Sequence, residues 1–113
     1  MDRKTKGIQG EAIAKHHYEK QGCEILETNY RYKRAEIDLV ALQKEKLLIF
    51  IEVKNRSRKD FGEPETFVSE AQQNRIKEAA EDYIFGINWK KDIRFDIFCV
   101  EPNGDVEVFE DAF

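Results

Sequence analysis

Three charged residues stand inside apolar segments, where strand-forming sequences rarely carry them. Asp38 lies in the run Glu-Ile-Asp-Leu-Val-Ala, and Glu52 and Lys54 lie in the run Leu-Leu-Ile-Phe-Ile-Glu-Val-Lys. Strands are depleted in Asp and, less strongly, in Glu and Lys, and charged side chains are seldom fully buried unless they are paired. The positions of these three residues therefore need a chemical explanation.

The spacing of the three residues favours a shared site on two adjacent strands. Side chains two positions apart on a strand point to the same face, so Glu52 and Lys54 lie together. A plain four-residue loop at residues 43–46 would place Asp38 opposite Ile51, whereas an odd-length connection or a bulge would place it opposite Glu52. We predict the odd-length case, which brings the two carboxylates to about 5 Å, the distance of a cross-strand pair.

Two carboxylates at that distance repel each other, and the repulsion raises the pKa of one of them unless a cation lies between them. A site with few carboxylates and open positions for water and phosphate suits Mg²⁺ or Mn²⁺. Such an ion lowers the pKa of a bound water and polarises a phosphoryl oxygen. Lys54 can orient the attacking water or stabilise the developing charge. Asp38, Glu52 and Lys54 are thus suited to the hydrolysis of a phosphodiester bond.

The same residues also allow a purely structural interpretation. Glu36 shares the strand face of Asp38, and Asp38 can pair with Arg34. Lys54 can form a cross-strand ion pair with either Glu36 or Glu52. An Asp followed 14 residues later by Glu-x-Lys is a weak motif in a chain in which 37% of the residues are charged. The spacing alone leaves both interpretations open.

The composition indicates one globular domain over residues 1–113. The chain is 41% hydrophobic and long enough for a single modest core. No run approaches the roughly 18 apolar residues of a membrane span, and no apolar segment follows the first six residues as in a signal peptide. We therefore expect a cytoplasmic protein without a membrane partner. Cys23 and Cys99 are too few for a disulfide scaffold and lack metal-ligand spacing.

The charge of the chain is distributed unevenly. The net charge of −4 argues against a bulk electrostatic binder of nucleic acid. Residues 1–60 carry 14 Lys and Arg against 10 Asp and Glu, whereas residues 61–113 carry 5 against 13. Six cations bracket the two charged strands, and we expect them to contact phosphates, with a solvated rim as the alternative. They are Arg31, Lys33, Arg34, Arg56, Arg58 and Lys59.

Hydrophobic periodicity predicts an α/β fold in the order α-β-β-β-α-β-β, with a mixed sheet and helices packed on it. Helices are expected over residues 8–21 and 69–86, and strands over residues 23–30, 36–42, 47–54, 93–100 and 105–109. The nearly continuous apolar run at 47–54 is typical of a central strand covered on both faces. In the first helix, Glu11 falls on or near the buried stripe, beside Gly10.

The arrangement of Asp38 and Glu52-Val53-Lys54 resembles the core of the PD-(D/E)XK nuclease superfamily. More closely, the whole chain resembles the YraN family, bacterial proteins considered endonuclease-like and similar to archaeal Holliday-junction resolvases. The matching residues are Gly7-x-x-Gly10-Glu11, Ile25-Leu26-x-x-Asn29-x-Arg31, Glu36-Ile37-Asp38-Leu39-Val40-Ala41, Phe50-Ile51-Glu52-Val53-Lys54-x-Arg56, Phe61-Gly62-x-Pro64, Gln73, Ala79-Ala80-x-x-Tyr83 and Arg94-Phe95-Asp96.

The resemblance implies a restriction-endonuclease-like three-layer fold and a role for individual residues. Asp38 and Glu52 would bind the metal with help from the Val53 carbonyl, and Lys54 would be the catalytic lysine. Glu11 would be a carboxylate from the first helix that joins the metal site.

A residue of the second helix is also implicated. Gln73 would be the polar residue that approaches the site from that helix.

Two positions depart from the family pattern. Ala35 stands where many members have Gly, and Gln72 stands where Lys is common.

We therefore expect a metal-dependent endonuclease that uses Mg²⁺ or Mn²⁺ to cut DNA, with branched or damaged DNA as the implied substrate. Chemistry on a two-fold symmetric junction would suit a homodimer. Two other functions are possible for the same sequence. One is a nucleic-acid-binding module of the same fold that cuts slowly or not at all. The other is a scaffold whose acidic tail and second-helix end bind a protein partner.

Overall fold

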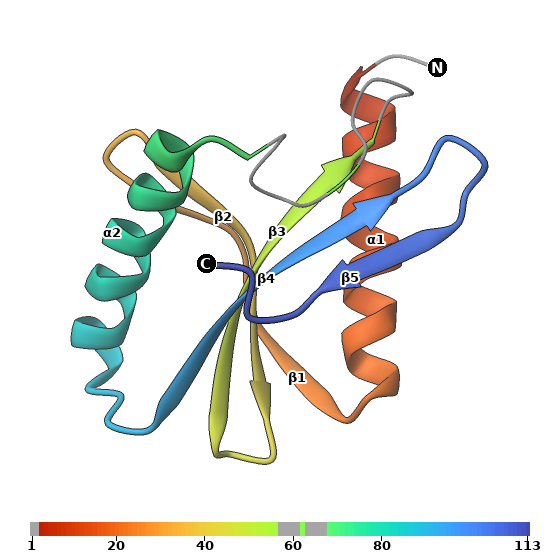
Figure 1. Cartoon of the computed structure of the whole chain (residues 1–113). Helices are drawn as coiled ribbons and strands as arrows, with labels where there is room; N and C mark the ends of the chain where they lie inside the picture. The colour runs from red at the N-terminus through yellow and green to blue at the C-terminus, as the bar shows by residue number, and fades with distance from the viewer. Residues whose placement is uncertain (1–2, 57–61, 63–67) are drawn as a thin grey trace.

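Two helices lie on opposite sides of a five-stranded sheet in the computed structural model of the chain, which describes residues 3–56, 62 and 68–113 (Figure 1). The elements are, in order, α1 (Arg3–Lys20), β1 (Cys23–Tyr32), β2 (Ala35–Gln43), β3 (Leu47–Asn55), α2 (Glu70–Ile87), β4 (Asp92–Val100) and β5 (Val106–Phe109). The predicted α/β order and the layered arrangement of helices on a mixed sheet are confirmed.

The strands lie in the spatial order β1-β2-β3-β4-β5. Every neighbouring pair is antiparallel except β3 and β4, which are parallel because α2 carries the chain back across the sheet between them. β3 is the middle strand, and residues 48–51 are almost completely buried. This confirms the expectation that the apolar run at 47–54 is a central strand covered on both faces.

Helix α2 packs on one face of the sheet through its apolar stripe, Ile76, Ala79, Ala80 and Tyr83. Ser69 caps its N-terminus by accepting a hydrogen bond of 3.1 Å from the Gln72 N–H. Asn88, in the left-handed conformation with a φ of 55°, follows its last turn. Neither helix in the described part of the chain combines the length and the apolar character that crossing a membrane requires.

Helix α1 covers the opposite face and begins at Arg3, earlier than the predicted start near residue 8. The polar residues before the apolar stripe are compatible with a helix but carry no period, so the pattern could not show them. Ala14 and Tyr18 are buried against the sheet. The stripe through these two residues is therefore the inward face, as predicted.

Gly10 allows α1 to lie unusually close to β3. A Cβ atom placed at Gly10 would lie 3.2–3.3 Å from side-chain atoms of Asn55 and Val53, a distance that a larger residue could occupy only if its neighbours moved. This close approach brings the next residue, Glu11, next to strand β2.

The two central strands are paired over only part of their length. The connection between β2 and β3 consists of residues 44–46, and their pairing runs from Gln43 opposite Leu47 to Leu39 opposite Ile51. Continued by one step, this register would set Asp38 opposite Glu52, but the ladder ends at Leu39 and Ile51, so the two carboxylates do not form the predicted cross-strand pair. The predicted odd-length connection itself is confirmed.

Beyond Leu39 and Ile51 the two strands separate, and we call this opening the strand fork. β2 continues along β1 as far as the pair of Tyr32 with Ala35, and β3 continues along β4 as far as the pair of Asn55 with Val100. In Figure 1 the diverging ends turn toward α2 and α1 respectively. The charged residues singled out in the sequence lie at this fork.

Candidate metal and catalytic site

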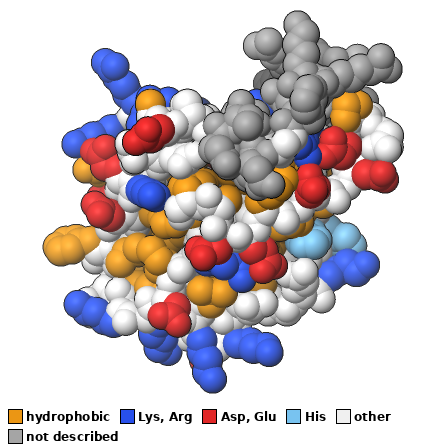
Figure 2. Space-filling model, viewed as in Figure 1, with side chains coloured by type: hydrophobic (Ala, Val, Ile, Leu, Met, Phe, Trp, Pro, Cys, Tyr) orange, Lys and Arg blue, Asp and Glu red, His pale blue; other side chains and the backbone are white. Residues whose placement is uncertain are grey.

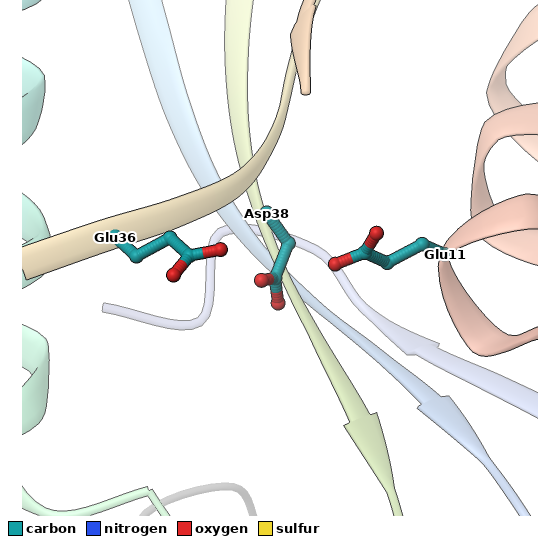
Figure 3. A group of neighbouring side chains, drawn as sticks. All are labelled: Glu11, Glu36 and Asp38. Carbon is teal, nitrogen blue, oxygen red and sulfur yellow. The ribbon is translucent and has the colours of Figure 1, made fainter. Parts of the chain in front are cut away.

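Three carboxylates converge at the strand fork. One oxygen from each of Glu11, Glu36 and Asp38 lies within 4.8 Å of the other two. Figure 3 shows Glu11 reaching from α1 toward the two β2 residues, with the three carboxylates turned toward one another. Oxygens that share one divalent cation lie up to about 4–5 Å apart, twice a metal–oxygen distance of about 2.0–2.6 Å. This all-oxygen donor set therefore fits Mg²⁺ or Mn²⁺.

The participation of Glu36 was not predicted. The sequence interpretation assigned the metal to Glu11, Asp38 and Glu52, with the Val53 carbonyl, and treated Glu36 only as an ion-pair partner. The signal was nevertheless present, because residues two apart on a strand share a face. Within the described residues, Glu52 lies outside the three-carboxylate group but lines the same pocket as Glu36 and Asp38.

Asp38 is positioned by the separation of β2 from β3. Its Oδ2 accepts a hydrogen bond of 2.7 Å from the backbone N–H of Val53. The side chain thus binds a strand N–H at the point where the β2–β3 ladder has ended. Burial raises the pKa of Asp38 to about 7, the Val53 hydrogen bond opposes the rise, and the nearby Glu11 and Glu36 carboxylates add to it.

Glu52 faces Asp38 from the other side of the fork. Burial, together with the negative charge of Asp38, raises the pKa of Glu52 to about 8. The positive charge of Lys54 acts in the opposite direction. Asp38 and Lys54 therefore both act electrostatically on Glu52, in opposite directions. A divalent cation near the two carboxylates would favour their ionised forms.

Two residues of β1 hold Glu36, and neither role was predicted. In the amide orientation that suits its neighbours, the Asn29 nitrogen lies 2.8 Å from Glu36 Oε1 and 2.8 Å from Glu11 Oε1. Arg31 Nη2 lies 3.4 Å from Glu36 Oε2. Asn29 has a φ of 53°, a conformation that Asn tolerates better than most residues. The sequence analysis gave Asn29 no role and expected Arg31 to contact phosphate rather than Glu36.

The contribution of α2 comes from Gln72 rather than Gln73. Gln72 Nε2 donates a hydrogen bond of 3.2 Å to Glu52 Oε1. Gln73 Nε2 donates one of 3.0 Å to the Val68 carbonyl, and Gln73 is not among the residues that line the pocket. The side chain expected to approach the site therefore stabilises the start of the helix, and its neighbour takes the place next to the carboxylates.

Glu36, Asp38, Glu52 and Gln72 line a pocket of about 280 Å³, which we call the acidic pocket. Its polar walls come from three carboxylates and three nitrogen-bearing side chains: Glu36, Asp38, Glu52, Arg34, Gln72 and Arg75. The pocket lies between β2, β3 and the first turns of α2. It is therefore large enough for a phosphate group and its ligands, with anionic and cationic groups on its wall.

The six cations expected to contact phosphates have different surroundings. Arg34 is exposed on the wall of the acidic pocket, whereas Arg31 pairs with Glu36 and Lys33 pairs with Glu78 at 3.6 Å. Arg58 and Lys59 lie outside the described residues.

Arg56 requires a correction. It is buried, and its Nη1 lies 2.8 Å from Glu101 Oε1 and 2.5 Å from Glu107 Oε1. Its Nη2 also donates to the Gly62 carbonyl at 3.1 Å. Because this guanidinium joins the end of β3 to the β4–β5 hairpin, it serves the fold rather than an open phosphate-binding surface.

Asp96, a further acidic residue of a core strand, is structural. It is fully buried and bound by Arg94, whose Nε and Nη2 donate to its two oxygens at 2.8 Å each. The Tyr18 hydroxyl donates to the same carboxylate at 2.8 Å. The ion pair with Arg94 neutralises this buried carboxylate, and the hydrogen bond from Tyr18 anchors α1 to the sheet.

Comparison with known proteins places the chain in a family. A model of the uncharacterised protein family UPF0102 matches residues 10–100. A UPF0102 protein of Flavobacterium psychrophilum is 41% identical over 110 residues, which cover 95% of this chain and 92% of the relative. One of Cytophaga hutchinsonii is 42% identical over 100 residues, which cover 88% of each chain. One of Dictyoglomus thermophilum is 46% identical over 101 residues, which cover 88% and 85%. The chain therefore belongs to the uncharacterised family UPF0102, which is the YraN family.

Proposed function

We propose that this protein is a metal-dependent endonuclease that hydrolyses DNA phosphodiester bonds with Mg²⁺ or Mn²⁺. The observation that carries the proposal is the convergence of Glu11, Glu36 and Asp38 within 4.8 Å of one another at the strand fork. Glu52 lines the same pocket, and Lys54 shares its strand face. Carboxylates with raised pKa values at a common site are typical of functional rather than structural positions.

Each residue has a distinct task in the proposed reaction. When bound, the metal would lower the pKa of the attacking water and polarise the phosphoryl oxygen. Glu11, Glu36 and Asp38 would hold it, with Asp38 oriented by the Val53 N–H. The Lys54 ammonium would stabilise the negative charge that develops on the phosphate.

A module that only binds nucleic acid would not require this arrangement. Burial and mutual repulsion raise the pKa values of Asp38 and Glu52, so keeping both carboxylates ionised in the free protein has a cost. Phosphate binding alone needs cations, and the carboxylates would oppose it. The intact set of Asp38, Glu52 and Lys54 therefore supports hydrolysis over passive binding. The preference for branched or damaged DNA is the part of the proposal that follows from family resemblance.

Cleavage assays test the proposal. The protein is incubated with four-way junction, nicked and linear DNA in Mg²⁺ or Mn²⁺, and products are resolved on denaturing gels. We expect Asp38→Asn and Lys54→Met each to lower the cleavage rate by at least about 100-fold. Asp92→Asn, on an exposed residue at the start of β4, is the matched control and should cut like the wild type. Cleavage that persists undiminished in Asp38→Asn would come from a contaminant and would overturn the proposal.

A further inference from the structure

A second pocket adjoins the acidic pocket on the α2 side. It has a volume of about 260 Å³, and its wall includes Tyr32, Lys33 and Glu78; we call it the Tyr32 pocket. Arg34 and Arg75 line both pockets. The two arginines come from different elements, the β1–β2 turn and α2, and together they form the boundary between the pockets.

Arg34 and Arg75 differ from the other arginines whose side chains the structure describes. Arg31, Arg56 and Arg94 all form ion pairs with carboxylates. Within the described part of the chain, Arg34 and Arg75 are exposed and have no carboxylate within 4.0 Å. They lack such a partner although three carboxylates line the acidic pocket beside them.

Unpaired guanidinium groups beside an acidic pocket are suited to an anionic ligand. A guanidinium binds phosphate oxygens through two parallel N–H donors, and it does so best where no carboxylate competes. The protein carries a net charge of −4, and on the side seen in Figure 2 the Lys and Arg side chains are scattered rather than gathered into one broad basic face. On this side, attraction for a DNA strand would come from a few local cations.

We infer that Arg34 and Arg75 together bind the phosphate next to the scissile one, and that the substrate strand continues from there into the Tyr32 pocket. This subsite rests on the proposed nuclease function, because the acidic pocket fixes where the scissile phosphate lies. The strand leaves the site over the start of α2. The Tyr32 ring and the aliphatic stems of the basic residues then form a surface for the flanking nucleoside.

The surroundings of the other cations favour a substrate strand that runs into the Tyr32 pocket. Arg56 is buried and paired at the opposite branch of the fork, so it cannot continue the path there. Lys33 pairs with Glu78 and also lies 5.2 Å above the centre of the Tyr32 ring. These contacts make Lys33 part of the wall of the Tyr32 pocket, and they leave Arg34 and Arg75 for the phosphate.

The subsite is tested by DNA binding in the cleavage-deficient Asp38→Asn background. A fluorescein-labelled four-way junction is titrated by anisotropy at several NaCl concentrations. Arg34→Gln and Arg75→Gln should each weaken binding by about tenfold and reduce the slope of log Kd against log salt by about 1. Arg75→Lys should keep the slope but lose part of the affinity, because lysine retains the charge without the two-donor geometry. Lys46→Gln, in the connection at the far end of β2 and β3, should change neither quantity.

Replacing single phosphates of the DNA by uncharged methylphosphonates locates the phosphate that the two arginines bind. Two junctions are made, each with one methylphosphonate, placed on one side or the other of the phosphate that the wild type cleaves. For one of them, the losses caused by the neutral linkage and by Arg75→Gln should be far less than additive, since both remove the same contact. Fully additive losses with both junctions would overturn the subsite.

The outcomes separate the subsite from the nuclease proposal. If the wild-type protein cleaves DNA but Arg34→Gln and Arg75→Gln behave like Lys46→Gln, the subsite is wrong and the nuclease proposal stands. If the wild-type protein neither binds nor cuts any of the DNAs, both are overturned. Both arginines are exposed, so thermal denaturation of the variants should match the wild type.

Discussion

The backbone N–H of Val53 donates a 2.7 Å hydrogen bond to Asp38 Oδ2 across the point where β2 and β3 separate. The β2–β3 ladder has ended at this point, so the Val53 N–H donates to the Asp38 side chain in place of a backbone carbonyl of β2. That side chain is thereby fixed in the direction of Glu11 and Glu36. One contact thus serves both the integrity of the sheet and the geometry of the candidate site.

This contact predicts that Asp38→Asn and Asp38→Ala will differ in stability although both should strongly lower the proposed cleavage activity. Asn retains an acceptor for the Val53 N–H and removes a charge that repels its neighbours, so the metal-free variant should be at least as stable as the wild type. Ala leaves a partly buried N–H without that acceptor, which costs about 1–3 kcal/mol. Urea denaturation in EDTA measures both. Equal stability of the two variants would contradict the role assigned to the hydrogen bond.

A second prediction concerns pH. The pKa values of Asp38 and Glu52 rise from their ordinary 3.8 and 4.5 to about 7 and about 8 in the folded protein. The folded state therefore binds protons more tightly, so these two groups favour folding below about pH 4 and lose that contribution as pH rises toward 8. The free energy of unfolding of the metal-free protein should fall between pH 5 and pH 8, and less so in Asp38→Asn/Glu52→Gln.

Added Mg²⁺ should reverse this trend, because it binds the ionised carboxylates. We expect the increase in melting temperature on adding Mg²⁺ to be larger at pH 8 than at pH 5. Glu24→Gln, at an exposed position of β1, should behave like the wild type in both series. A larger Mg²⁺ effect at pH 5 than at pH 8 would contradict the assignment of the raised pKa values to the metal-binding carboxylates.

A third prediction concerns Asn29, which lies within 2.8 Å of both Glu11 and Glu36. Asn29→Gly preserves the positive φ of 53° but removes the amide that orients the two carboxylates. We expect a loss of about tenfold or more in Mn²⁺ affinity, as for other residues that orient metal ligands. Electron paramagnetic resonance of free Mn²⁺ measures this affinity. Asn29→Ala should lose the same affinity and, in addition, about 1 kcal/mol or more of stability, because Ala is strained at that φ.

The neighbouring glutamines of α2 give a fourth prediction. Gln72 contacts Glu52, so Gln72→Ala should lower the cleavage rate with little effect on stability. Gln73→Ala should show the opposite pattern, because Gln73 binds the Val68 carbonyl before the helix. Gln72→Lys places a cation beside Glu52, which lowers its pKa and should move the pH dependence of cleavage toward lower pH. Measuring rate against pH and melting temperature for the three variants separates the two residues.

Much of the fold could be predicted from local patterns. The apolar stripe of α2, its Ser69 cap and the continuous apolar run of β3 each follow from short-range periodicity. The odd connection between β2 and β3 followed from a chemical argument, since it was the register that brought Asp38 to Glu52. The start of α1 was placed too late because its first residues are polar and have no period to read.

The errors at the site have a common physical origin. Alternation along β2 puts Glu36 on the face of Asp38, but the separation of β2 from β3, which opens this face to Glu11, is a three-dimensional feature that no alternation encodes. Arg56 was expected to contact phosphate because it flanks the charged strand in sequence, whereas it is buried and paired with Glu101 and Glu107 near the β4–β5 hairpin, which lies far along the chain. Gln72 and Gln73 are adjacent in a helix, and only the helix rotation decides which one faces the carboxylates.

The strand fork leaves the beginning of β2 joined to β1 but no longer to β3. In this part of β2, backbone hydrogen bonds no longer join the strand to β3. A cation bound by Glu11, Glu36 and Asp38 would connect it to helix α1 instead. The ion would then act as a tether within the protein as well as a reagent. Metal loading would then stiffen the beginning of β2, beside the acidic pocket.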